Sequence, residues 1–206
     1  MPFDVAEFVD ACLGARREGQ PQLAVRDLLA RATSEPRDVE AGLGGKAGLV
    51  ALHSSSDLTI LHVVWPPGMS LFPHDHRMWA AIGVYGGQED NAFYRRDATG
   101  IVASGGRQLR EHEVLLLGDD AIHAVTNPQQ HAFTGAIHVY GGDFFAVPRS
   151  AWTADTLIEH AYDPDEAMEA FRAADEEWLA RARPAPEATG MARPAPEAAG
   201  RATPDA

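Results

Sequence analysis

The sequence predicts an all-β core, an antiparallel sandwich or barrel, preceded by helices and followed by one more helix. Short runs of β-branched and aromatic residues succeed one another between positions 49 and 140, and turn residues such as glycine and proline separate them. These runs do not alternate with helical segments, which disfavours a doubly wound α/β fold. The chain has 206 residues, 45% of them hydrophobic, which is enough to bury the core of one domain.

The first 45 residues are expected to form helices that pack on the barrel. Apolar residues repeat at helical spacing over 3–12 and again over 23–29, and Pro21 stands where the second helix can begin. A glycine-rich stretch over 41–48 ends this helical segment, which we place at residues 1–45.

The barrel is placed at residues 46–150. Its expected strands are the runs 49–53, 58–65, 78–85, 91–96, 113–117 and 132–140. Turn signals separate them: PPG at 66–68, GG at 86–87, GG at 105–106, GDD at 118–120 and NP at 127–128. Short strands and turns at this spacing are typical of sandwiches and barrels.

A helical segment is expected at residues 151–181, with its helix over 164–181. An apolar stripe on this helix can dock on the barrel; it consists of Ala167, Met168, Phe171, Ala174 and Leu179. Beyond the helix, the decamer ARPAPEATGM is nearly repeated as ARPAPEAAGR. This composition, rich in proline, alanine and glycine, predicts that residues 182–206 are disordered.

Net charge, hydropathy and cysteine content exclude several kinds of partner and indicate where the protein is located. The formal net charge is −13 and the pI about 5.0, so the surface repels phosphate backbones and nucleic acid is not an expected partner. No run approaches the ~18 apolar residues of a membrane span, and the N-terminal stretch lacks the basic and apolar blocks of a secretion signal. The single cysteine, Cys12, excludes an intramolecular disulfide framework and fits a reducing cytoplasm. We therefore expect a cytoplasmic protein that acts on a small molecule, either as a monomer or as a homodimer.

Three histidines form the pattern with the clearest chemistry. His74 and His76 are two residues apart, so on an extended segment their side chains point to the same face. His123 follows 47 residues after His76, where another strand is expected to begin. Imidazole suits Fe, Zn, Cu and Ni, and three such ligands leave open positions for a substrate and O2. The alternative to a metal site is that residues 74–76 form a polar loop and that His123 is a surface histidine whose hydrogen bonds are satisfied.

The residues around these histidines resemble the two cupin motifs. GMSLFPHDH, at 68–76, has a glycine, five residues and HxH, and GDDAIH, at 118–123, resembles the second motif. The stretch PHDHRMWAAIGVYGG is further similar to bacterial thiol dioxygenases, which include cysteine and 3-mercaptopropionate dioxygenases. The resemblance covers roughly residues 45–145. It implies a double-stranded β-helix, the cupin jelly-roll barrel, in which the three histidines hold one Fe(II) per chain, with other divalent metals as alternatives.

The same resemblance implies a reaction and a catalytic pair. A small thiol, cysteine or a mercapto acid, would be oxidised to a sulfinate with O2 as co-substrate, which would make the protein a non-haem iron dioxygenase. Thiol dioxygenases carry a strand of the form Ser-x-His-x-Tyr after the third ligand, and here His138 and Tyr140 stand at the matching distance. Ala136 replaces the serine, which removes the hydroxyl that would orient His138. Ala80 and Ala81 occupy the positions at which other cupins often carry a glutamate ligand. Cysteine dioxygenases of the mammalian type carry a cysteine there that crosslinks to the tyrosine, and Ala81 cannot form this crosslink.

Four further residues near the motifs are considered for a role in substrate binding. Trp79 is a candidate for the wall of the substrate pocket, with a core tryptophan as the alternative. Arg95 is a candidate for binding a substrate carboxylate through its planar donor fork, with a solvated arginine as the alternative. Glu89 and Asp90 follow a glycine turn and are interpreted as a solvated loop near the mouth of the barrel, where a substrate role stays open.

Two other functions stay open. One is a cupin metalloenzyme that acts on another small molecule, and the other is a non-catalytic cupin that binds a metal or a small molecule. In the non-catalytic case Tyr140→Phe would leave ligand affinity almost intact and no product would form. A catalytic Tyr140 predicts a large loss of turnover with little loss of iron.

Overall fold

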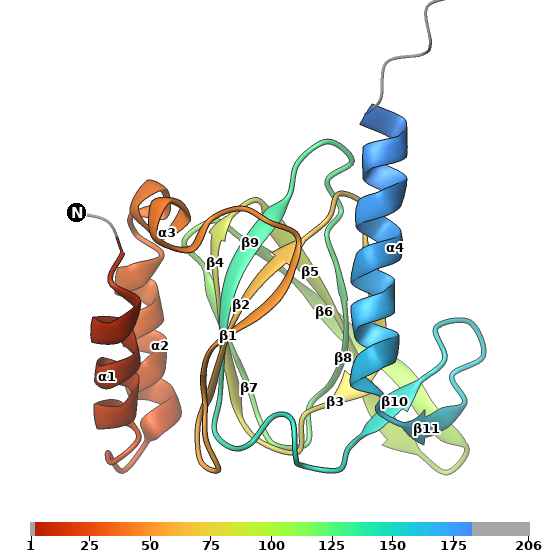
Figure 1. Cartoon of the computed structure of the whole chain (residues 1–206). Coiled ribbons are helices and arrows are strands. Elements are labelled where there is room, and N and C mark those ends of the chain that lie inside the picture. Colours follow the sequence, from red (N-terminus) through yellow and green to blue (C-terminus); the bar gives the residue numbers. More distant parts are fainter. Residues whose placement is uncertain (1–2, 183–206) are drawn as a thin grey trace, which may run out of the picture.

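Within residues 3–182, which the computed structural model describes, four helices flank a β-barrel (Figure 1). The helices are α1 (Val5–Ala15), α2 (Pro21–Ala32), α3 (Pro36–Leu43) and α4 (Pro164–Ala182). None of them is both long and apolar enough to cross a membrane. The disorder predicted for the C-terminal tail concerns residues that lie outside the described range, apart from Ala182, which ends α4.

Eight strands, β2 to β9, form a double-stranded β-helix. Their bounds are β2 (Thr59–Trp65), β3 (Ser70–Asp75), β4 (Ala80–Gly86), β5 (Gln88–Asp97), β6 (Gly100–Arg110), β7 (Val114–Leu117), β8 (Ile122–Thr126) and β9 (Thr134–Tyr140). The strands pair antiparallel from the ends inward, β2 with β9, β3 with β8, β4 with β7 and β5 with β6. Pairing of β4 with β9 and of β5 with β8 completes two sheets, β2-β9-β4-β7 and β3-β8-β5-β6. This nested order is that of a jelly roll, so the predicted fold class is confirmed.

Three more strands extend the sheets at their edges. β1 (Gly48–Ser54) lies beside β2, and β10 (Ser150–Trp152) and β11 (Glu159–Ala161) lie beyond β3. The start of the expected helical segment thus forms strands instead, because β10 pairs with β3, where Ala151 lies opposite His74. β6 has no predicted counterpart, since its glycine-rich, polar sequence is largely exposed and shows no apolar alternation.

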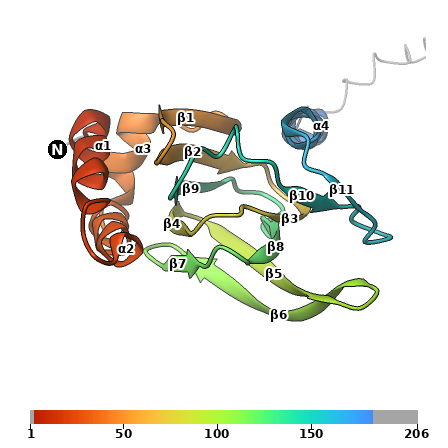
Figure 2. The same ribbon diagram turned by 90° about the horizontal axis from the view of Figure 1, so that it is seen from below.

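The sheet that contains β2, β9 and β4 is covered on both faces. Every residue of β2 and β9 is buried, and α1, α2 and α3 pack on the outer face, away from the barrel interior (Figure 2). Gly83 in β4 allows α2 to approach closely, since a Cβ there would lie 3.2 Å from Leu29 Cβ and 3.1 Å from Thr33 Cγ2. Burial on both faces explains why these strands are largely apolar in the sequence and do not alternate between apolar and polar residues.

Helix α4 covers the barrel on the side away from α1 and α2 (Figures 1 and 2). Ala167 and Phe171 of the predicted stripe are buried, and the Phe171 ring stacks on Trp65 with 4.8 Å between the ring centroids. Met168 and Leu179 of the same stripe are 47% and 54% exposed. The helix therefore docks mainly through its N-terminal half.

A single residue, Gly87, connects β4 to β5. Its φ of +80° favours glycine, and a Cβ on it would lie 2.5 Å from Thr134 Oγ1 and 2.9 Å from the Phe133 carbonyl oxygen. The Thr134 hydroxyl secures the turn, because it donates to the Gln88 carbonyl at 2.8 Å and accepts from the Gln88 amide at 3.0 Å. Glu89 is therefore already the second residue of a strand, and its side chain is buried.

Replacing Gly87 by alanine is expected to lower the free energy of unfolding by about 1–3 kcal/mol, because an L-residue resists this φ and its Cβ would collide with the Phe133 carbonyl. Denaturant unfolding followed by circular dichroism measures the change. Gly86→Ala is the matched control, since Gly86 has no positive φ and open space around its Cβ position. An equal loss in both variants would contradict this role of Gly87.

Candidate metal centre

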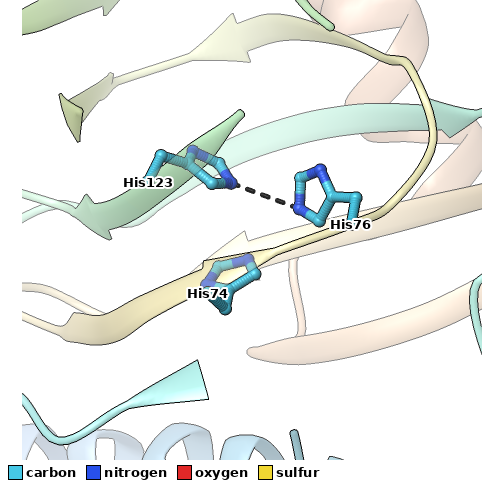
Figure 3. A group of neighbouring side chains, drawn as sticks. All are labelled: His74, His76 and His123. Atoms are coloured by element: carbon cyan, nitrogen blue, oxygen red, sulfur yellow. Dashed lines mark hydrogen bonds between the residues drawn. The ribbon is translucent and has the colours of Figure 1, made fainter. Parts of the chain in front are cut away.

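Three histidines meet inside the barrel (Figure 3). His74 lies in β3 directly opposite His123 in β8, and His76 follows just after the end of β3. All three are at most 4% exposed, and their candidate ligand nitrogens all lie within 4.8 Å of one another. The pairing of β3 with β8 thus unites residues that are at least 47 positions apart in the sequence.

Hydrogen bonds fix which nitrogen of two of the rings is free. His74 Nδ1 donates to the Phe72 carbonyl at 3.0 Å, and His123 Nδ1 donates to Asn91 Oδ1 at 2.6 Å. A neutral imidazole that donates through Nδ1 has its lone pair on Nε2. In both rings Nε2 is therefore the atom available to a metal.

The spacing of the nitrogens suits a shared ion. His123 Nε2 lies 3.2 Å from His76 Nε2, the pair joined by the dashed line in Figure 3. Two imidazole nitrogens, each about 2.1 Å from one ion, stand that far apart when the angle at the ion is about 100°. No Asp, Glu or Cys among residues 3–182 joins the group, and Ala80 and Ala81 are fully buried. These residues fit a divalent ion held by three imidazoles.

Burial keeps these imidazoles neutral, which is the form that binds a metal. Burial lowers the pKa of His74 to about 4; the hydrogen bond to Phe72 opposes the shift and the Arg149 charge adds to it. Burial also holds the pKa values of His76 and His123 well below their ordinary value, and the neighbouring histidines act in the same direction. The cluster therefore presents lone pairs rather than positive charges at neutral pH.

Two residues of β9 continue the polar network beside the cluster. His138 Nδ1 lies 3.1 Å from the Tyr140 hydroxyl, and both residues are 3% exposed. The Tyr140 ring meets His76 edge-on, with 4.9 Å between the centroids and 82° between the planes. Burial raises the pKa of Tyr140, so the phenol keeps its proton. The structure thus places the candidate catalytic pair next to the candidate metal ligands.

The interpretation of Glu89 as part of a solvated loop is wrong, because its side chain is fully buried. The carboxylate accepts hydrogen bonds from Trp65 Nε1 at 2.9 Å and Asn91 Nδ2 at 3.1 Å, and His138 Nε2 lies 3.2 Å away. Burial alone would raise the pKa of Glu89, but His138 and the other two donors bring this pKa below its ordinary value. Glu89 is therefore ionised. The sequence signal that could have revealed it is Gly87, since a one-residue turn starts β5 before Glu89.

A small cavity adjoins the cluster. It encloses about 20 Å³, which is room for about one water molecule. Besides His74, His123, His138 and Tyr140, its walls are apolar or aromatic: Leu49, Val63, Trp65, Leu71, Val125, Phe144, Tyr162, Ala167 and Phe171. Ala167 and Phe171 belong to α4, so this helix forms part of the cavity wall.

A buried arginine, Arg149, packs against two of the aromatic rings that line this cavity. Its guanidinium lies between the rings of Phe144 and Tyr162, 4.0 and 3.8 Å from their centroids, and Nη1 donates to the Phe144 carbonyl. The buried Nε and Nη2 have no hydrogen-bond acceptor among residues 3–182, although the residue is only 8% exposed. A guanidinium with two unpaired donors can bind an anionic group. Sequence reasoning missed Arg149, because its partners come from separate segments and no spacing connects it to the motifs.

Neither of the two candidate substrate-binding residues lines this cavity. Trp79 packs in the apolar cluster between the sheet and the N-terminal helices, and its indole lies directly over Gly141. Arg95 is exposed on β5 and lines a separate surface hollow with Asp75 and Arg96. Their surroundings are those of a core tryptophan and a solvated arginine, the two alternatives that the sequence leaves open.

No protein-family model matches the sequence. Among solved structures, the chain is similar to an RmlC-like cupin with a double-stranded β-helix fold from Methanocaldococcus jannaschii, with 11% identity and a TM-score of 0.40 over 50% of this chain and 85% of that one. It is also similar to a cupin superfamily protein from Desulfitobacterium hafniense, with 16% identity and a TM-score of 0.40 over 52% and 87% of the two chains. The DMSP lyase DddQ from Ruegeria pomeroyi shows 15% identity and a TM-score of 0.40 over 53% of each chain. At these TM-scores the likenesses do not bear on the activity of this protein, and the strand order alone identifies its fold.

Replacing His123 by alanine is expected to weaken divalent-metal binding by more than the ~10–100-fold that loss of a ligand's hydrogen-bond partner costs. Elemental analysis of protein loaded with Fe(II) without oxygen and then desalted measures the bound metal per chain. His131→Ala is the control, because His131 is exposed and outside the cluster. Unchanged metal content in His123→Ala would refute the ligand assignment.

Proposed function

We propose that this protein uses one Fe(II), held by His74, His76 and His123, to oxidise a small thiol acid such as cysteine or a mercapto acid with O2. The observation that carries the proposal is a group of three neutral imidazoles, with no carboxylate ligand among residues 3–182, beside a buried Tyr140–His138 pair. This combination agrees with the ligand set and the pair that the resemblance to thiol dioxygenases implies. The choice of iron rests on that resemblance, because imidazole also suits Zn, Cu and Ni.

The proposed reaction adds both oxygen atoms of O2 to sulfur. A thiol, RSH, and O2 give the sulfinic acid, RSO2H, so the sulfur loses four electrons, O2 gains them, and no further reductant is required. When bound, Fe(II) supplies the redox chemistry that allows O2 to react with a thiol.

Tyr140 and Arg149 are the residues that we expect to contact the substrate. Tyr140 lines the cavity, so its hydroxyl oxygen can accept a hydrogen bond from a polar group next to the metal ligands. The two unpaired N–H groups of Arg149 suit the two oxygens of a carboxylate. The apolar walls of the cavity limit the access of water to the Tyr140 hydroxyl, and Arg149 is only 8% exposed, so electrostatic interactions of both groups are less screened than at the surface.

Oxygen consumption tests the proposal directly. Protein prepared without oxygen and loaded with Fe(II) is given cysteine, 3-mercaptopropionate, cysteamine and a set of non-thiol acids. We expect O2 uptake with at least one thiol acid and one sulfinate formed for each O2 consumed. Uptake with a non-thiol acid alone would favour a metalloenzyme with another substrate. Bound iron without any uptake would favour a non-catalytic binding protein, and either result refutes thiol oxidation.

Replacing Arg149 by lysine is expected to raise KM for a thiol acid about 10- to 100-fold, because lysine keeps the charge but cannot pair with a carboxylate through two parallel hydrogen bonds. KM for cysteamine, which has no carboxylate, should change little. Steady-state O2 uptake measures both constants. Arg95→Lys is the matched control, and a KM increase in that variant instead of Arg149→Lys would assign the carboxylate to Arg95.

A further inference from the structure

His138 lacks the partner that its own strand is expected to supply. Ala136, two residues earlier on β9, has no hydroxyl to orient the imidazole. The Glu89 carboxylate, from β5 in the other sheet, takes this place, with Oε2 3.2 Å from His138 Nε2. The other ring nitrogen, Nδ1, faces the Tyr140 hydroxyl at 3.1 Å. Glu89, His138 and Tyr140 thus form a continuous line that ends at the wall of the metal site.

We infer that Glu89 is the positioning residue of this site, because it fixes the tautomer of His138 and the amide orientation of Asn91. Through these two neighbours it sets how Tyr140 and the candidate ligand His123 are presented. The inference deepens the proposed function and rests on it only where Tyr140 acts on a substrate. The direction of each hydrogen bond follows from the contacts of the protein itself.

The first arm of the network runs from Glu89 to Tyr140. An ionised carboxylate only accepts hydrogen bonds, so His138 Nε2 carries a hydrogen towards Glu89. When the His138 imidazole is neutral, its Nδ1 is then an acceptor, and the Tyr140 hydroxyl donates to it. The lone pairs of the phenolic oxygen are left for the cavity that Tyr140 lines. A serine at position 136 would not impose this direction, since a hydroxyl both donates and accepts.

The second arm runs from Glu89 to the candidate ligand His123. Asn91 Nδ2 donates to Glu89 Oε1 at 3.1 Å, which leaves Asn91 Oδ1 to accept from His123 Nδ1 at 2.6 Å. If the amide were reversed, its NH2 group would face His123 Nδ1, and the lone pair of that ring would move there, away from His74 and His76. The Glu89 charge therefore holds His123 in the tautomer that suits a metal.

The carboxylate can impose both directions because only donors surround it. Trp65 Nε1 donates at 2.9 Å to the same oxygen that His138 contacts, and an indole nitrogen is a donor only. Asn91 occupies the other oxygen, and the side chain is fully buried. A neutral amide at position 89 cannot accept from all three groups, because one of its two ends is itself a donor.

The variant Glu89→Gln tests the inference, since glutamine has the same shape and must reverse at least one arm. Long-range 1H–15N NMR spectra of protein with 15N-labelled histidine distinguish protonated from unprotonated ring nitrogens. In the metal-free wild type at neutral pH we expect His138 to be protonated only at Nε2 and His123 only at Nδ1. In Glu89→Gln at least one of the two rings should change tautomer. The 15N chemical shift typical of an unprotonated nitrogen would then appear at Nε2 of His138, at Nδ1 of His123, or at both.

Asp90→Asn is the matched control, because it removes the neighbouring carboxylate on β5, which contacts Gln88 and Gln108 rather than the network. Both rings should keep the wild-type pattern in that variant. The inference is overturned if wild-type His138 carries hydrogen on Nδ1 or on both nitrogens, or if Glu89→Gln leaves both rings unchanged. The wild-type spectrum alone shows which His138 nitrogen carries hydrogen, even if the variant fails to fold. None of these spectra requires iron, thiol or O2, so failure of the proposed function would leave the result intact.

Discussion

The candidate site depends on one buried charge, the Glu89 carboxylate. An ion removed from water costs several kcal/mol unless it is paired and hydrogen-bonded, and Glu89 meets this condition through Trp65 on β2, Asn91 on β5 and His138 on β9. These strands belong to both sheets, so the carboxylate fixes how the sheets face each other at the level of the histidines. Trp65 also stacks on Phe171, and the position of α4 is therefore connected to the same charge.

The two sheets contribute different parts of the site. His74 and His123 come from paired strands of one sheet, and His138 and Tyr140 from a central strand of the other. The helices α1 to α3 keep water from the outer face of that second sheet, which allows every residue of β9 to be buried. A protonated phenol and an ionised carboxylate coexist in this buried site because the Tyr140 hydroxyl and the Glu89 carboxylate each meet specific partners rather than solvent.

Local patterns account for the parts of the fold and site that could be predicted. Short apolar runs marked the buried strands β2, β4 and β9, and the HxH spacing with a later histidine marked the residues that the structure brings together. The features that were missed depend on long-range contacts. Glu89 is polar and follows a glycine turn, as loop residues do, but β5 begins directly after Gly87 and the Glu89 carboxylate meets donors from β2 and β9. Arg149 is buried by aromatic rings from two separate segments, and β6 has no apolar face.

The surroundings of Arg149 make folding and binding thermodynamically linked. The protein surrounds this guanidinium with Phe144 and Tyr162 but supplies no acceptor within residues 3–182 for two of its nitrogens. An anion that accepts from them binds the native barrel and not the unfolded chain, in which the rings no longer enclose the charge. Such an anion therefore stabilises the fold in proportion to the logarithm of its concentration. If Arg149 binds such an anion, the melting temperature of this barrel depends on the concentration of the anion as well as on the protein itself.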